Sequence, residues 1–224
     1  MGTVIVSLLP LIVGAAVVPI WIIMVLFLLR SEGGLLKAAA FAAGAIIMRL
    51  AQGMLFGYVF GKSAEASGDS GSSVIVSTLL LVVGILMLIA AFKQWRKEDD
   101  PDAPPPKWIA AISGLSAVKA FGMGALLVVI AAKQWVFTLS TIGIIGQAQL
   151  SQAENVITFL FYVLAASSLV LAPIVVYAVA PTQSAKTLGA AQGWLERHNR
   201  VIVIVISLIF GLWFLWKGIA GLIG

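Results

Sequence analysis

Six apolar runs dominate the sequence, and each is long enough to cross the hydrocarbon core of a bilayer. A spanning helix needs about 20 predominantly apolar residues. The composition agrees, because 61% of the residues are hydrophobic and only 10% are charged, whereas soluble domains carry about 25% charged residues. We therefore predict an all-α membrane protein with six transmembrane helices. They cover approximately residues 4–29, 35–60, 74–92, 117–149, 155–180 and 201–221.

The composition also excludes several kinds of site. The chain has no cysteine, so disulfides, thiolate metal sites and cysteine nucleophiles are ruled out. Its single histidine, His198, lies in a polar connector, and we find no nucleophile–base pair, metal-ligand cluster or phosphate-binding loop. The acidic and proline-rich residues 98–107 are typical of a stiff solvated linker rather than of a metal site. We expect neither an enzyme nor a protein that holds a metal or cofactor.

Two basic residues lie deep inside apolar runs. Lys133 is near the middle of the run 117–149, followed by Gln134, and Arg49 is about halfway along the run 35–60, with Gln52 three residues later on the same helix face. A charge at membrane depth is costly and usually faces a protein interior or a wet cavity. No Asp or Glu lies within any run. Two positive groups without a carboxylate predict a site for an anion.

Other residues would complete this substrate site. Thr138 follows Lys133 and, with Gln52 and Gln134, would donate hydrogen bonds. Pro10 and Pro19 interrupt the first run, and a break at Pro19 would shape the cavity, since broken spans expose backbone groups that can bind ligand. Two alternatives stay open: Pro19 as the kink of a packing helix, and Arg49 as a structural arginine bonded to the carbonyls of a broken neighbour.

The chain divides into two halves that we expect to be inverted repeats. The first three-helix repeat is 1–93, the cytoplasmic linker is 94–107, and the second repeat is 108–224, with an amphipathic segment at 185–197. Residues 61–73 are expected to form a flexible polar loop. The third and sixth runs both begin Val-Ile-Val with a glycine ten residues later, Gly84 and Gly211, and Trp21 aligns with Trp135. Three spans in each half require opposite orientations, which is a transporter signature.

Basic residues gather in the connectors of one side. Numbering the connectors alternately gives nine basic residues on one side and two on the other. By the positive-inside rule, both termini should face away from the cytoplasm. The nine are Arg30, Lys37, Lys93, Arg96, Lys97, Lys107, Lys186, Arg197 and Arg200, and the two are Lys62 and Lys217.

The connector Gly193-Trp-Leu-Glu-Arg-His-Asn199 and the last span, ending Gly211-Leu-Trp-Phe-Leu-Trp-Lys-Gly218, carry a family resemblance. Together with Leu8-Leu-Pro-Leu-Ile-Val-Gly14, they resemble the GAP family of glycopeptidolipid- and sulfolipid-addressing proteins, a branch of the LysE-type exporter superfamily. That family usually has Asn-Pro-Lys-Asn in its fourth span. This chain has Ala131-Ala-Lys-Gln134, which keeps the lysine but neither the proline nor the asparagines.

The resemblance implies a six-span protein of the bacterial inner (plasma) membrane that moves glycolipid or other lipid to the cell surface of mycobacteria-like bacteria. Our prediction is an exporter of an anionic amphipathic lipid. The alternatives are a LysE-type exporter of a small solute, such as an amino acid or ion, and an accessory subunit of a larger lipid exporter. Expected partners are membrane lipids, a larger lipid-export machinery and a second copy forming a homodimer, and no nucleic acid.

Overall fold

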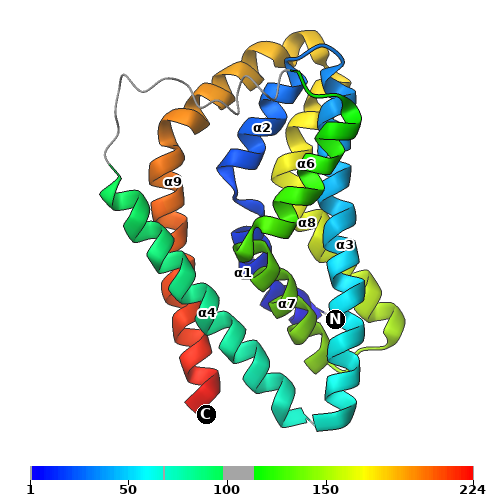
Figure 1. Cartoon of the computed structure of the whole chain (residues 1–224), viewed down its shortest axis with the longest axis vertical. Helices are drawn as coiled ribbons and strands as arrows, with labels where there is room; N and C mark the ends of the chain where they lie inside the picture. Colours follow the sequence, from blue (N-terminus) through cyan, green and yellow to red (C-terminus); the bar gives the residue numbers. More distant parts are fainter. Residues whose placement is uncertain (1, 68, 98–113, 224) are drawn as a thin grey trace.

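The computed structural model describes residues 2–67, 69–97 and 114–223, and these residues form helices joined by short connectors (Figure 1). Four of the helices are long and apolar enough to cross a membrane, and the spans number six if each of two bent pairs counts as one. The all-α prediction is confirmed. The predicted linker 94–107 lies outside the described residues beyond residue 97. The helices are α1 (Gly2–Ala16), α2 (Pro19–Leu29), α3 (Gly34–Ser67), α4 (Asp69–Arg96), α6 (Ala117–Ile130), α7 (Ala132–Gln147), α8 (Gln152–Val179) and α9 (Pro181–Ile223).

The first bent pair, α1 and α2, is broken at Pro19 as predicted. The helix axes change direction by 58°, and Val18 has the non-helical angles φ −127° and ψ 87°. Proline disfavours the helical conformation of the residue before it and has no N–H to continue the helix. Pro10 lies inside α1, so the expectation that it also interrupts this span is wrong. Only the break at Pro19 divides the first span.

The second bent pair, α6 and α7, turns by 72° without a proline. Ala131 leaves the helical region with ψ 90°, although its N–H still donates to the carbonyl of Leu127. The indole Nε1 of Trp135 donates to the carbonyl oxygen of Val129 at 2.6 Å. In a continuous helix that carbonyl would accept the N–H four residues later. The indole N–H of Trp135 therefore replaces the backbone donor that the Val129 carbonyl loses at the break.

The predicted polar loop at 61–73 is wrong. α3 continues to Ser67 and α4 begins at Asp69, so the two helices extend across most of this segment. Ala64, Glu65 and Ala66 have high helix propensity. The loop was predicted from the polar residues around them, and helix propensity prevails over that polarity. At the other end of the bundle, the predicted amphipathic segment 185–197 and the sixth span form one continuous helix, α9. Its first part lies across the end of the bundle before the chain descends (Figure 1).

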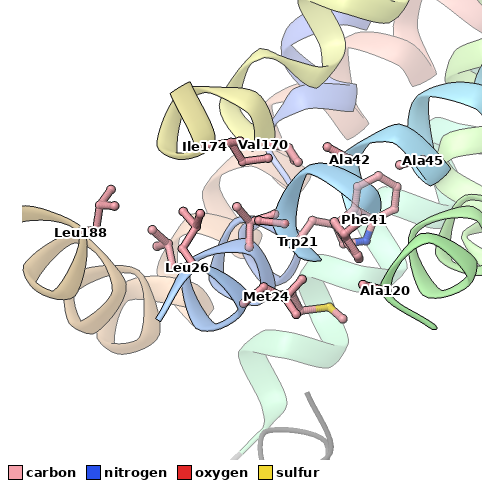
Figure 2. Packing of buried hydrophobic residues seen from close by; sticks show 14 of the residues in the cluster. Trp21, Met24, Leu26, Phe41, Ala42, Ala45, Ala120, Val170, Ile174 and Leu188 are labelled. Atoms are coloured by element: carbon pink, nitrogen blue, oxygen red, sulfur yellow. The ribbon is translucent and has the colours of Figure 1, made fainter. Parts of the chain in front are cut away.

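Two apolar clusters form the interior. One joins α2, α3, α6, α8 and the start of α9, and Figure 2 shows its side chains, among them Trp21, Phe41 and Ile174. The second joins α1, α4, α7, α8 and the later part of α9, around Phe137 and Phe214. α8 contributes to both clusters. Several buried polar residues lie on the same helices, among them Arg49 on α3, Gln134 on α7 and Ser167 on α8.

Glycines allow two helix pairs to pack backbone against backbone. A Cβ on Gly44 of α3 would collide with the carbonyl of Phe121 in α6, and one on Gly124 of α6 would collide with the carbonyl of Phe41 in α3. In α4, a Cβ on Gly84 would lie 2.9 Å from the carbonyl oxygen of Gly211 in α9. Small residues of this kind let membrane helices approach closely. They hold α3 against α6 and α4 against α9.

Candidate functional site

Arg49 lies in the interior of the bundle, on α3, and is 1% exposed. Its Nη1 donates to Ser167 Oγ of α8 at 3.0 Å, and its Nη2 donates to Gln134 Oε1 of α7 at 2.9 Å. The guanidinium also lies over the ring of Trp21 in α2, 5.3 Å from the ring centroid. One side chain thus joins four helices, including one member of each bent pair.

Gln134 extends this arrangement to α1. While its Oε1 accepts from Arg49, its Nε2 donates to the carbonyl oxygen of Ala15 at 3.2 Å. In a continuous helix, the carbonyl of Ala15 would accept the N–H of residue 19, but residue 19 is proline and has none. Pro19 therefore acts indirectly: it frees a backbone acceptor, and Gln134 occupies it.

The hydrogen-bond partners that the structure gives Arg49 are neutral. Ser167 and Gln134 accept through a hydroxyl and an amide oxygen, and Arg49 Nε has no hydrogen-bond partner among the described residues. The nine acidic residues of the sequence lie in connectors, in α9, near helix ends or at positions 98–102. Buried cations in membrane proteins are normally paired. In the described part of the chain, Arg49 is held by the dipoles of Ser167 and Gln134 and by the ring of Trp21, without a counter-charge.

A stripe of polar side chains continues from Arg49 between α3, α7 and α8. The Tyr162 hydroxyl interacts electrostatically with Arg49 and lies beside Thr138 and Thr141. The stripe residues are at most 3% exposed, and each has a polar atom without a hydrogen bond of good geometry in the described part of the chain. They are Gln52, Thr138, Thr141, Thr158 and Tyr162. Buried polar groups normally find partners, so this stripe has unused capacity for hydrogen bonds.

The side chain of Lys133 makes different contacts from that of its neighbour Gln134. It is only partly buried, and its Nζ lies over the ring of Phe137, 5.5 Å from the centroid. Lys133 belongs to the first turn of α7, where the positive end of the helix dipole adds to its own charge. No acidic residue lies in that turn. This leaves a positive region at the second helix break.

The structure brings together some of the predicted site residues. Arg49 and Gln134 share a hydrogen bond, Gln52 and Thr138 follow them one turn later on their own helices, and Pro19 is linked through Ala15. Lys133 adjoins the group in sequence without a hydrogen bond to it among the described residues. The sequence prediction missed Trp21, Ser167 and the hydroxyls of α8. Thr158 and Tyr162 are four residues apart on α8, and this helical spacing was the signal that could have found the α8 hydroxyls.

Comparison with known proteins identifies one family. The family model described as "Sap, sulfolipid-1-addressing protein" matches residues 8–220, which includes all of the residues of this site. Searches of curated proteins and of solved structures give no significant match. The match agrees with the resemblance seen in the sequence at the level of the addressing-protein family, and placement in the wider LysE-type superfamily stays a prediction.

Proposed function

The chain belongs to the sulfolipid-1-addressing protein family, and from that premise we propose that it translocates an anionic amphipathic lipid across the membrane that its helices span. The observation that carries the proposal is Arg49, which is 1% exposed and bonded to neutral side chains. In this proposal the head group of the lipid is the missing counter-charge.

The chemistry of the guanidinium fits an oxyanion. Arginine presents a planar set of donors that matches sulfate, phosphate or carboxylate oxygens, and charge-assisted hydrogen bonds are about twice as strong as neutral ones. An anionic oxygen would therefore displace the Gln134 amide or the Ser167 hydroxyl, which now occupy two of the donors. The substrate would gain more from Arg49 than these neutral partners do.

The polar stripe supplies the rest of a head-group site. Gln52, Thr138, Thr141, Thr158 and Tyr162 offer amide and hydroxyl groups that make no hydrogen bond of good geometry among the described residues. Such groups suit the hydroxyls of a sugar, whereas an uncharged acyl chain would leave them unpaired. An anionic glycolipid head group combines the charge that Arg49 requires with the hydroxyls that the stripe can bind.

The helix breaks provide the movement that this function needs. Arg49 is closed from solvent here, so substrate can enter only after helices move. Each bent pair meets at a few residues, Val17 and Val18 in the first and Ala131 in the second, and such junctions absorb rotation. The Gln134 side chain makes two hydrogen bonds, one to Arg49 of α3 and one to Ala15 of α1. When an anion replaces Gln134 at Arg49, the first of these hydrogen bonds is lost. Binding would thereby loosen the closed arrangement.

We also propose that the two halves are inverted repeats. Each half runs in the order bent pair, long helix, long helix. The carbonyls of Ala15 and Val129, four residues before Pro19 and Lys133, are each bonded by a side chain of α7. Gly84 and Gly211, matched in the sequence, also meet in the α4–α9 contact. Repeats of this kind place substrate sites where broken helices meet near mid-membrane.

Lys133 would serve as a second cation on the path of the head group. It stands at the positive end of α7, next to Gln134, and remains partly exposed. Its position suits an encounter with the anion before or after Arg49. This role keeps Lys133 in the proposed site without a direct contact to the polar stripe.

Translocation in proteoliposomes tests the proposal. Purified protein is reconstituted with head-group-labelled lipids, one carrying a sulfate and one zwitterionic, and the label reaching the outer leaflet is followed with a membrane-impermeant quencher. We expect the wild-type protein to move the sulfated lipid, and Arg49→Gln to reduce that rate at least tenfold. The exposed Arg197→Gln is the matched control and should keep the wild-type rate.

Two results would overturn the proposal: an Arg49→Gln variant that translocates at the wild-type rate, or equal rates for both lipids. Efflux of amino acids or inorganic ions from the same proteoliposomes would instead favour the small-solute exporter. If the isolated protein moves neither and gains activity only with a second membrane protein, the accessory-subunit alternative holds.

A further inference from the structure

A groove of about 780 Å³ lies along the C-terminal part of α4, far along the chain from the Arg49 site. Among the described residues its lining comes from one flank of a single helix, and the composition of that flank changes sharply along the helix. The earlier residues are apolar and the last are basic. The lining residues are Ile85, Leu88, Ile89, Phe92, Lys93, Arg96 and Lys97.

The apolar wall faces outward. Ile85, Ile89 and Phe92 are 43%, 45% and 53% exposed, while Leu88 at the base of the groove is partly buried and packs close to Gly211 of α9. α4 is one of the helices long and apolar enough to span a membrane. An exposed apolar flank on such a helix adjoins lipid acyl chains rather than water.

The basic side chains at the end of this groove, here called the basic rim, are not needed to cap the last carbonyls of α4. The carbonyls of Gln94 and Trp95, at the end of α4, accept hydrogen bonds from Arg200 of α9 at 3.2 and 2.8 Å. The three rim side chains, Lys93, Arg96 and Lys97, are exposed. None of them has a salt-bridge partner among the described residues, although Arg96 lies over the Phe92 ring at 5.7 Å.

We propose that this groove binds an anionic phospholipid of the surrounding membrane. One acyl chain would lie on Ile85, Ile89 and Phe92, and the phosphate would contact Lys93, Arg96 and Lys97. The wall from Ile85 to Lys93 is about 12 Å long at 1.5 Å per residue, and one leaflet's hydrocarbon is about 15 Å deep. Clustered basic residues at a membrane boundary favour anionic over zwitterionic head groups.

Residues 98–102 follow the rim, lie outside the described part of the chain and contain four carboxylates. The lipid titration of the full-length protein therefore measures the charge of the rim together with these residues. Binding in the groove does not depend on the translocation proposed above, because Arg49 and the polar stripe contribute none of its lining residues.

Native mass spectrometry of the full-length protein, titrated with phosphatidylglycerol or phosphatidylcholine, tests the groove. We expect the wild-type protein to bind phosphatidylglycerol more tightly. The variant Lys93→Gln/Arg96→Gln/Lys97→Gln should bind phosphatidylglycerol about 100-fold more weakly, since each of the three basic residues near the phosphate contributes roughly fivefold. A matched control removes three exposed charges elsewhere, Lys119→Gln/Lys186→Gln/Arg197→Gln, and should keep the preference.

Two further variants distinguish lipid bound in the groove from lipid bound elsewhere on the protein. Ile89→Trp fills the apolar wall and leaves the rim intact, so it should weaken phosphatidylglycerol binding, and circular dichroism checks that the helices remain folded. Val175→Trp places the same side chain on an exposed apolar position of another helix, α8, where Val175 is 58% exposed, and should leave the preference unchanged. The proposal is overturned if the rim variant binds phosphatidylglycerol as the wild type does, if the three-charge control loses as much, or if Val175→Trp weakens binding as much as Ile89→Trp.

Discussion

Arg49 and Gln134 are joined by a hydrogen bond of 2.9 Å in the bundle interior. The same Gln134 amide donates to the carbonyl of Ala15 at 3.2 Å, so three helices are linked through one neutral side chain. The link exists because Pro19 cannot donate to that carbonyl. A proline in the first half of the chain thus creates the acceptor for a glutamine in the second half.

This relationship predicts coupling between Pro19 and Gln134. Gln134→Ala leaves the Ala15 carbonyl without its donor and should lower the free energy of unfolding by about 1–3 kcal/mol. Pro19→Ala restores an N–H that can bond the same carbonyl. In the Pro19→Ala background, Gln134→Ala should therefore lose about 1 kcal/mol less. Detergent-induced unfolding of the four proteins of this cycle measures the coupling, and strictly additive effects would contradict it.

A second prediction concerns Trp135 at the other break. Trp135→Phe removes the indole donor to Val129, bonded at 2.6 Å, but preserves an aromatic ring for the edge contact with Phe56. We expect a loss of about 1–2 kcal/mol in the free energy of unfolding. Trp216→Phe is the control, because Trp216 is 64% exposed. Equal losses in both variants would show that the indole bond does not stabilise the break.

The break at Ala131 marks the limit of what the sequence could predict. The break at Pro19 follows from one residue, because proline both lacks an N–H and constrains its neighbour. The stretch Ala131-Ala-Lys-Gln134 contains no such residue. Two side chains of α7 hold its bend by bonding carbonyls that the two breaks leave without a backbone donor. Trp135 bonds Val129 across this break, and Gln134 bonds Ala15 at the break before Pro19. The second of these is a tertiary contact, which no local pattern encodes.

The depth of Arg49 was predictable, whereas its partners were not. An arginine midway along an apolar run must be buried or reach an end, and Arg49 is 1% exposed. Ser167 and Trp21 lie on helices that the sequence alone does not place beside α3. The polar segment 61–73 shows the opposite error, since polarity was taken for a loop where helix propensity prevailed.

A third prediction addresses the α4–α9 contact. In Gly84→Leu the new side chain would overlap backbone of α9, because even a Cβ would lie 2.6 Å from the N of Leu215. We expect a loss of about 1–3 kcal/mol, as for other overpacked sites. Gly122→Leu is the matched control, since no atom lies within 4 Å of a Cβ there, and its effect should stay within about 0.5 kcal/mol. The unfolding midpoints of the two variants test this prediction, and equal midpoints would contradict it.

A fourth prediction separates a structural from a substrate-binding Arg49. Arg49→Met removes a buried charge with neutral partners, so the free energy of unfolding should rise by about 1–3 kcal/mol despite two lost hydrogen bonds. Translocation of an anionic lipid should fall at least tenfold in the same variant. A structural arginine would give the opposite pairing: lower stability, with activity lost only in proportion to the folded fraction. Unfolding and translocation are therefore measured on one preparation.

The final prediction compares two lysines in the same helical position. Lys133 lies in the first turn of α7 and Lys119 in the first turn of α6, so each is placed unfavourably at the positive end of a helix dipole. Neutralising either, as Lys133→Gln or Lys119→Gln, should raise stability by a similar small amount, about 0.3–1 kcal/mol. Only Lys133 stands at a helix break beside Gln134, whereas Lys119 is exposed at a helix start. Translocation of the sulfated lipid should fall at least tenfold in Lys133→Gln and stay unchanged in Lys119→Gln, and parallel loss in both would remove Lys133 from the substrate path.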